Sequence, residues 1–329
     1  MDAIRWLARY IRPYRGSWIF ASVLTIVVAL LNIVTPYISG MIVDLVIQGG
    51  QDNLLLPLLF VMIAGTVFRT WLRYLYQIRF EYISQDVLFQ IRDDLYTKFQ
   101  ELDFSFFNHT RTGDIMARMT GDTDAIRHSV AWAYFNILDN VVLFVSALIF
   151  LGTVNMKLTL ALLVVTPFIA VLTIMLSSKA NRAYFEIRES FSRLNSMVEE
   201  NIRGNQIVKA FANERFEEEK FDKVNQGFRD RNLESAAVSS RYLPLIETFA
   251  GFMSVIAVGF GGWLAITGEM SVGNLVTFTG LIWMINVPMR NLGGHMNDLQ
   301  KLFAGTIKIR EMLMVQPEIP IEERKEFDY

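Results

Sequence analysis

FFNHTRTGDIMARMTGDTDAI, residues 106–126, lies within a long polar stretch between two apolar segments. Thr112 predicts the start of a helix, because a threonine side chain can accept hydrogen bonds from the free amides of a first turn. Asp114 supports that start, since a carboxylate is favourable at the positive end of the helix dipole. Gly121 predicts the end of this helix and the opening of the next one.

The predicted helix has only two turns, and a helix of this length is not stable alone in water. It must therefore be docked on something. Two interpretations are open: the stretch caps its own chain, or long helices present it as a docking knob to a partner that this sequence does not contain. We expect the docking knob. The residues assigned to it are Thr112, Gly113, Asp114, Ile115, Met116, Arg118 and Met119.

The composition indicates a membrane protein. Hydrophobic residues make up 52% of the 329 residues, and mean hydropathy is +0.31. A net charge of -2 gives no electrostatic argument for nucleic acid as a partner. The chain has no cysteine, which excludes disulfides, thiol nucleophiles and cysteine metal sites. Its three histidines are far apart in the sequence, so we expect no metal site. No cluster of carboxylates, histidines or a nucleophile is visible near one interface, so we expect no catalytic residues.

Six apolar segments are long enough to cross a bilayer, and we expect each to be a transmembrane helix. They lie near residues 18–47, 54–75, 129–152, 158–178, 243–267 and 272–292. The joins after the first, third and fifth segments are short, and they read QGGQDN, TVNMK and TGEMS. The other two joins are long, at residues 76–128 and 179–242. The sequence therefore predicts an all-α membrane protein with two large excursions on one side.

Residues 1–15 alternate apolar and basic positions at helical spacing. This pattern predicts a short amphipathic helix lying on an anionic membrane surface, with Trp6 as an interfacial anchor. The six-helix domain itself is expected over residues 16–316.

Charge placement predicts the orientation in a cell membrane. Lys157 is the one lysine or arginine in the short joins. By the positive-inside rule, both long joins and both termini are expected on the cytoplasmic side.

The long joins are predicted to be rigid helical hairpins. None of the eight prolines falls inside them, and apolar residues recur there at helical spacing. The tip of the second join reads VKAFANERFEEEKF, residues 208–221, and has the same organisation as the first, with Asn213 as the expected helix cap. The residues assigned to this second tip are Phe211, Asn213, Glu214, Arg215 and Phe216. Two matching tips favour one partner surface, or two copies of it.

These stretches together resemble the transmembrane domain of ABC exporters. Residues 106–126 are similar to the first-loop pattern of that family, and residues 208–221 are similar to its second-loop pattern. Residues 273–320 resemble its sixth helix, with a central proline and a terminal Pro-Glu-Ile. The resemblance covers nearly the whole chain in the right order.

The resemblance implies an ATP-driven exporter that works as a dimer, with a second transmembrane subunit that is identical or different. It implies that the two tips are coupling helices, which transmit the motion of nucleotide-binding domains. The second one is expected to contact the domain of the other subunit. Mg-ATP is expected on those domains, because this sequence holds no G-x-x-x-x-G-K-[ST] phosphate loop. Residues 317–329 resemble the linker to such a domain. We therefore expect a transmembrane part cut from a longer ATP-hydrolysing translocase, rather than the partner of a separate ATPase.

A few polar residues inside the apolar segments are candidates for the substrate pathway. An intramembrane charge needs a partner or a water-filled cavity. We expect Asp139 to pair with Arg69, either to fix helix packing or to contact substrate. Helix depth predicts that Glu247 meets Arg290, with Arg73 as a rival partner. The candidate set is Arg69, Asn136, Asp139, Asn140, Glu247, Trp283, Asn286 and Arg290.

Three function classes remain open from the residues alone. The first is an exporter domain moving an amphipathic drug-like or lipidic compound. The second is a proton-coupled secondary transporter, which usually has short cytoplasmic joins and broken helices. The third is a polytopic membrane enzyme, which needs a reactive cluster near one interface. The long helical joins favour the exporter.

Overall fold

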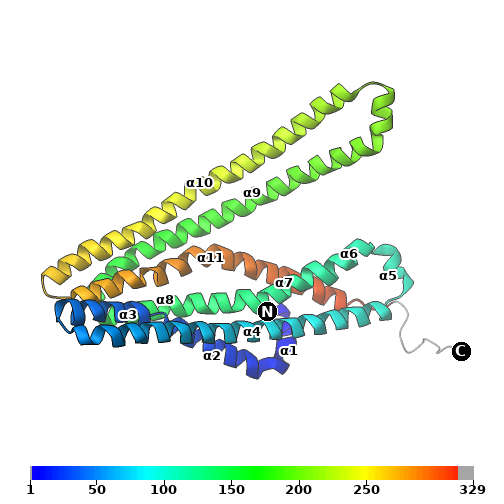
Figure 1. Ribbon diagram of the computed structural model, residues 1–329. Helices are drawn as coiled ribbons and strands as arrows, with labels where there is room; N and C mark the ends of the chain where they lie inside the picture. The colour runs from blue at the N-terminus through cyan, green and yellow to red at the C-terminus, as the bar shows by residue number, and fades with distance from the viewer. Residues whose placement is uncertain (1, 318–329) are drawn as a thin grey trace. The chain divides into compact units, whose positions relative to one another are not determined.

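A computed structural model describes residues 2–317 (Figure 1). The predicted linker therefore lies outside the described residues, apart from Pro317. Within the described part, the regular elements are all helical: α1 (Asp2–Ile11), η1 (Arg12–Tyr14), α2 (Arg15–Leu31), α3 (Val34–Met41), η2 (Ile42–Gln48), η3 (Asp52–Leu54), α4 (Leu55–Glu101), α5 (Phe104–His109), α6 (Thr112–Ala117), η4 (Arg118–Asp122), α7 (Thr123–His128), η5 (Ser129–Ala133), α8 (Tyr134–Val154), α9 (Met156–Ala210), α10 (Glu214–Ile266) and α11 (Val272–Leu313).

The prediction of six membrane helices is confirmed. The described residues contain six helical stretches that are long and apolar enough to cross a bilayer, and they are Ile4–Gln48, Asp52–Glu101, Thr112–Val154, Met156–Ala210, Glu214–Ile266 and Val272–Leu313. Each is longer than the roughly 20 residues that a span requires. The surplus length confirms that the polar joins continue the helices as two hairpins.

The chain divides into two compact units. The first unit comprises Met1–Thr159, Val258–Pro288 and Gly294–Tyr329, and the second comprises Leu160–Ala257 with Met289–Gly293. We describe each unit by itself.

In the first unit, α2 packs along α4, and aromatic rings fill the contact. Trp18 of α2 meets Phe80 of α4 edge-on, with ring centroids 5.2 Å apart. Phe80 also stacks on Phe135 of α8 at 5.8 Å. Tyr76 and Phe80 are almost completely buried. Rings of this size remove a large apolar area from solvent or lipid and fix how the three helices pack together.

The N-terminal helix α1 packs on protein. Trp6 and Leu7 are each only 6% exposed, in a cluster with Ile91 of α4 and Met312 of α11. The Tyr10 hydroxyl also donates to Asp94 of α4 at 2.5 Å. The prediction that Trp6 anchors the helix in the lipid interface is therefore wrong, because neighbouring helices cover its ring. The arginines of this segment remain exposed, and their contact with a membrane stays a prediction.

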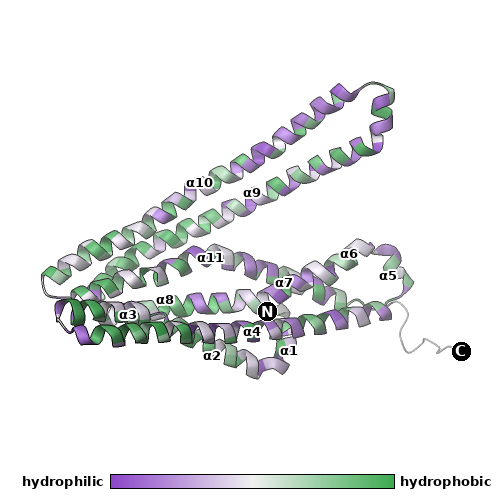
Figure 2. Cartoon of the chain, viewed as in Figure 1, coloured by the Kyte–Doolittle hydropathy of each residue, from purple (hydrophilic) through white to green (hydrophobic). Residues whose placement is uncertain are grey.

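In the second unit, α9 and α10 run side by side as antiparallel arms (Figure 1). Arg231 of α10 pairs with Glu186 of α9 at 3.1 Å, and the rings of Phe191 and Phe228 lie 5.6 Å apart. Figure 2 shows that these arms change from mainly hydrophobic near the join of α10 to α11 to mainly hydrophilic at the opposite tip. Such a gradient fits a helix pair that leaves a bilayer and continues in water.

Candidate functional site

The first tip is a short helical segment that projects between α4 and α8. The helix α6 begins at Thr112, but its cap residue is Arg111, and no side chain caps it. The prediction that Thr112 caps the helix is therefore wrong, and Thr112 is already helical. Gly121 does not end the helix either, because η4 is a π-helical segment that leads directly into α7.

An apolar groove of about 660 Å³ lies beside this tip. Phe104 is 86% exposed there, and Met116 is 54% exposed. The residues that line the groove are Tyr96, Phe99, Gln100, Leu102, Asp103, Phe104, Phe107, Thr112, Ile115, Met116 and Met119. Four of the residues predicted for the docking knob are therefore in this groove. Exposed apolar side chains gathered around a hollow are typical of a protein-binding surface.

Contacts from two other helices hold the first tip in place. The Arg92 Nε of α4 donates to the Met119 carbonyl at 3.1 Å and to the Thr123 hydroxyl at 3.3 Å. Lys308 of α11 pairs with Asp122 at 3.2 Å. A side chain on Gly305 would come within 3.1 Å of the Asp122 carbonyl oxygen, so α11 approaches the tip closely. Sequence spacing did not reveal these contacts, because the partners lie far apart along the chain.

The second tip is a tight turn, and this corrects the prediction of a short separate helix there. Phe211, Ala212 and Asn213 connect α9 to α10, and Ala212 has a positive φ of 48°. The Asn213 carbonyl accepts from the Glu217 amide at 3.3 Å, as expected for the residue that precedes a helix. The other residues assigned to this tip, Glu214, Arg215 and Phe216, form the first turn of α10.

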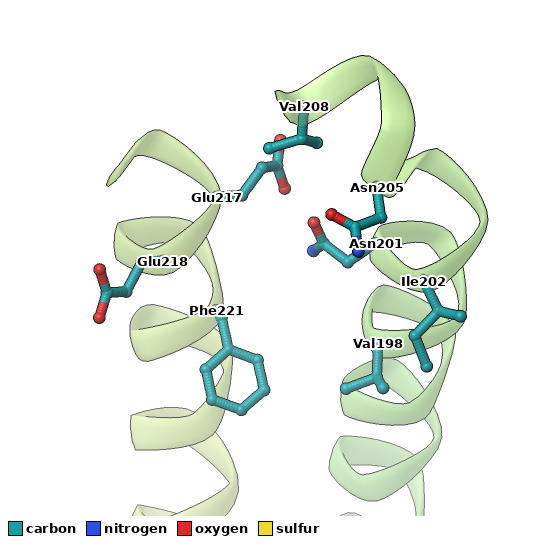
Figure 3. A pocket seen from close by; sticks show the side chains of 8 residues that line it. All are labelled: Val198, Asn201, Ile202, Asn205, Val208, Glu217, Glu218 and Phe221. Atoms are coloured by element: carbon teal, nitrogen blue, oxygen red, sulfur yellow. The ribbon is translucent and has the colours of Figure 1, made fainter. Parts of the chain in front are cut away.

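Just before that turn, α9 changes direction. Figure 3 shows the piece that carries Val208 crossing above the stem that carries Val198 and Ile202. This change of direction lies on the N-terminal side of Phe211, and the residues assigned to the second tip follow it. Ile207, next to Val208, has a large apolar side chain that is 66% exposed.

A second hollow of about 390 Å³ lies under this crossing, between the two arms (Figure 3). Its lining residues are Val198, Asn201, Ile202, Asn205, Val208, Glu217, Glu218 and Phe221. Phe211 is 79% exposed and Phe216 58% exposed at the same tip. Both tips thus present large apolar side chains, which cost free energy in water unless a partner covers them.

In the first unit, the membrane polar residues do not pair as predicted. Arg69 donates to the Asn32 side chain at 2.9 Å, so the expected pair of Arg69 with Asp139 is wrong. Asp139 lies near Arg73 instead, which is also close to Tyr76. Helix depth placed Arg69 and Asp139 at one level, but it did not give the direction in which each side chain points.

Among the other candidates of the first unit, the Asn140 side chain donates to the Asn136 carbonyl within α8 at 2.7 Å. On α11, Trp283 is 40% exposed, and the buried Oδ1 of Asn286 has no hydrogen-bond partner among the described residues. An acceptor of this kind is suited to a donor that the chain itself does not provide.

In the second unit, Glu247 and Arg290 do form a pair. The Arg290 Nη2 lies 3.7 Å from the Glu247 Oε1, and the side chains are 45% and 66% exposed. This confirms the contact between Glu247 and Arg290 that helix depth predicted. A long, half-exposed ion pair is adjustable and can exchange its partner for another charged group.

Comparison with known proteins gives matches to ABC transporters throughout. A family model described as the ABC transporter transmembrane region matches residues 18–289. The chain is 27% identical to the uncharacterized ABC transporter ATP-binding protein YknU of Bacillus subtilis (strain 168), over 97% of this chain and 54% of the relative. It is 26% identical to the multidrug resistance-like ATP-binding protein MdlA of Escherichia coli (strain K12), over 94% of this chain and 53% of the relative. The chain therefore spans about half the length of the curated relatives it matches.

Proposed function

The chain belongs to the ABC transporter transmembrane family, and from this premise we propose that it is the membrane part of an ATP-driven exporter. The observation that carries the proposal is the pair of exposed apolar tips at the ends of long helices. The relatives are called ATP-binding proteins and are about twice as long as this chain. We infer that nucleotide-binding domains, carrying Mg-ATP, cover both tips and drive the motion of the helices.

The tips and both termini lie in the cytoplasm in this proposal. Lys157 is the one lysine or arginine in the three short joins, so the positive-inside rule assigns the joins to the outside. Two copies of the chain, or this chain with a related one, form the pathway. The second tip contacts the nucleotide-binding domain of the other subunit.

The proposed substrate is an amphipathic drug-like or lipidic compound. Multidrug resistance-like relatives support this class. The polar candidates support it as well, because they are few and adjustable, as in the half-exposed pair of Glu247 and Arg290. A substrate that is mainly apolar needs only a few such polar contacts.

The experiment compares a charge placed at the first tip with the same charge placed elsewhere. Met116→Asp puts a carboxylate into the apolar groove, whereas Met156→Asp puts one at the start of α9, beside the polar Asn155 and Lys157. The two methionines are 54% and 59% exposed, so the pair is matched. In the complete transporter, Met116→Asp is expected to lower substrate transport per ATP hydrolysed by at least about tenfold. A charge buried at an interface costs several kcal/mol, and about 1.4 kcal/mol already corresponds to a factor of ten.

The control Met156→Asp is expected to transport normally, and both variants should reach the membrane in normal amounts. Transport and ATP hydrolysis are measured in the same proteoliposomes. If Met116→Asp transported substrate as efficiently as Met156→Asp, the tip would not transmit the motion of the ATPase, and the proposal would be wrong.

A further inference from the structure

A pocket of about 350 Å³ lies between α4 and the segment where η5 continues into α8. Its lining comes from residues 74–81 of α4 and from residues 131–135 of η5 and α8. These residues stand where the apolar runs 54–75 and 129–152 meet the first long join. The pocket is therefore at the level where both helices pass from lipid into water.

Aromatic side chains form much of the pocket wall. Tyr74 and Trp132 line it and are 63% and 47% exposed. The ring of Phe135 lies 5.5 Å from that of Trp132, and Phe135 is itself buried against Phe80 in the aromatic core. Tryptophan and tyrosine gather at the membrane–water interface, and their ring faces attract cations. The pocket thus offers exposed rings on a firmly packed base.

Glu81 gives the pocket its charge. The Glu81 Oε1 accepts hydrogen bonds from the Gln85 side chain at 2.8 Å and from Arg127 at 3.1 Å. Its Oε2 accepts none from another described residue, and the side chain is 37% exposed. Because a carboxylate has about four acceptor positions, this second oxygen is available to a donor from outside the chain.

The negative charge of Glu81 is not neutralised locally. Arg127 also pairs with Asp124 at 2.8 Å, so two carboxylates share one guanidinium and the three groups keep a net negative charge. Among the described residues that line the pocket there is no lysine or arginine. Opposite charges attract strongly near a protein surface, so the pocket favours a cation over an anion.

A metal ion does not match this lining, but an organic cation does. Glu81 is the one carboxylate among the described lining residues, and the described chain holds no group of three or more histidines, aspartates or glutamates that could bind a metal. An ammonium ion needs less, because one charge-assisted hydrogen bond and contacts with aromatic rings hold it. The volume is near the lower end of small-molecule sites, which span roughly 300–1,000 Å³, so the ligand is small.

We propose that this pocket binds an organic ammonium group, as carried by the amine headgroup of a membrane lipid. The ammonium donates to the Glu81 Oε2 and lies against Trp132 and Tyr74. The amide of Gln77, in the same lining, donates to the phosphate that adjoins such an amine. A lipid is favoured as the source because the pocket lies at the level of the headgroups.

Two further observations support a site here. Trp132 belongs to η5, which is wound as a π-helix from Ser129 to Ala133, and such widened turns are frequent at functional sites. None of the polar candidates for the substrate pathway lines this pocket. The proposed site is therefore additional to that pathway, and it does not rest on the export function.

The test measures whether the pocket is occupied. Ile78→Cys places a reporter in the lining of a chain that has no cysteine of its own. The complete transporter is held in nanodiscs of phosphatidylethanolamine or of phosphatidylglycerol with the same acyl chains. N-ethylmaleimide is the reagent, because it is neutral and its approach does not depend on the charge at residue 81. Peptide mass spectrometry counts the label at residue 78 alone.

Labelling of the Ile78→Cys reporter is expected to be about tenfold slower in phosphatidylethanolamine, since a charge-assisted hydrogen bond keeps the headgroup in place. The reporter control is Tyr82→Cys on the same helix, which is exposed and outside the lining. Its labelling rate should be the same in both lipids.

Glu81→Gln should remove this protection, while its amide oxygen still accepts from Arg127 and Gln85. The matched control is Glu101→Gln on the same helix, because the Glu101 side chain is also 37% exposed and also ion-paired. It should leave the protection unchanged.

The aromatic wall is tested in the same way. Trp132→Leu should raise the labelling rate in phosphatidylethanolamine about threefold, through the loss of a cation–π contact. The matched control Trp263→Leu, at a tryptophan that is 54% exposed, should have no effect. Trp132→Leu also replaces Glu81→Gln as the test if that variant does not fold.

Free ethanolamine, added to the phosphatidylglycerol nanodiscs, distinguishes the two sources of an amine. Protection by ethanolamine would show that a soluble amine is sufficient, whereas protection by phosphatidylethanolamine alone would show that the lipid is required. Both results support an ammonium site if Glu81→Gln abolishes them. The proposal is overturned if residue 78 is labelled equally fast under all three conditions, or if the protection persists in both Glu81→Gln and Trp132→Leu. The test involves neither ATP nor transport, so its failure would leave the export function untouched.

Discussion

The two tips have similar sequence patterns, but different contacts hold them in place. Around the first tip, Arg92 and Lys308 reach in from α4 and α11, and Met119 packs on a buried core. At the second tip, the ion pairs among the described residues join only its own two arms, as Lys220 does with Glu200 at 4.0 Å. Arg215 pairs only along α10, with Glu219.

If the tips receive the motion of the ATPase as proposed, this difference decides how each tip passes it on. A tip that contacts two other helices passes a displacement directly to them, because packed interfaces shift as units. A tip that is connected only to two long helices passes a displacement along those helices. We infer that the first tip moves together with α4 and α11, whereas the second tip moves together with α9 and α10.

The largest expected effect concerns the core beneath the first tip. Ile126 is 1% exposed, whereas Ile207 at the second tip is 66% exposed. Ile126→Ala should lower the free energy of unfolding by about 2–5 kcal/mol, because it leaves a cavity. Ile207→Ala should change it by less than about 0.5 kcal/mol. Thermal unfolding in detergent measures both, and equal effects would mean that the two tips are equally supported.

The next effect concerns the polar contacts. Arg92→Ala removes the donor to Met119 and Thr123 and should destabilise the first tip by about 1.5–3 kcal/mol. Arg215→Ala at the second tip removes a pair in which the arginine is 92% exposed, and about 0.5 kcal/mol is the most we expect. Limited proteolysis reports which tip opens. Faster cleavage near residue 119 in Arg92→Ala, without faster cleavage near residue 212, supports the difference, and the reverse pattern contradicts it.

The pattern of success and failure in the sequence analysis has a physical cause. Apolar runs gave the six spans, since length and hydropathy are local properties. Counting residues from the short join between α10 and α11 correctly predicted the pair of Glu247 and Arg290, because a very short join makes the two helices antiparallel neighbours. The same counting failed for Arg69, because Asn32 lies at the break between α2 and α3 and takes its hydrogen bond.

The contact of Asp44 with Ser271 and Gly273, at the start of α11, was missed for a related reason. These partners are more than 220 residues away from Asp44 along the chain, and no local pattern connects them. A signal was nevertheless present, because Gly40 and Gly273 are small residues near the ends of spans that begin and end the domain. Small residues in a span indicate a close helix approach, but they do not say which helix approaches.

The smallest expected effect tests the turn of the second tip. Ala212 has a φ of 48°, a conformation in which a Cβ is strained and glycine is not. Ala212→Gly relieves that strain but also loosens the unfolded chain, so a net stabilisation of the tip of about 0.5–1 kcal/mol is expected. The matched control is Ala210→Gly in the last turn of α9, where glycine should destabilise by a similar amount.

Hydrogen exchange of the amides at residues 205–216 measures both effects, since an exposed turn opens locally and does not require global unfolding. Slower exchange in Ala212→Gly, confined to this tip, supports a strained turn that is held in place only by α9 and α10. A change that spread into the first unit would instead show that the second tip is supported from outside its own arms.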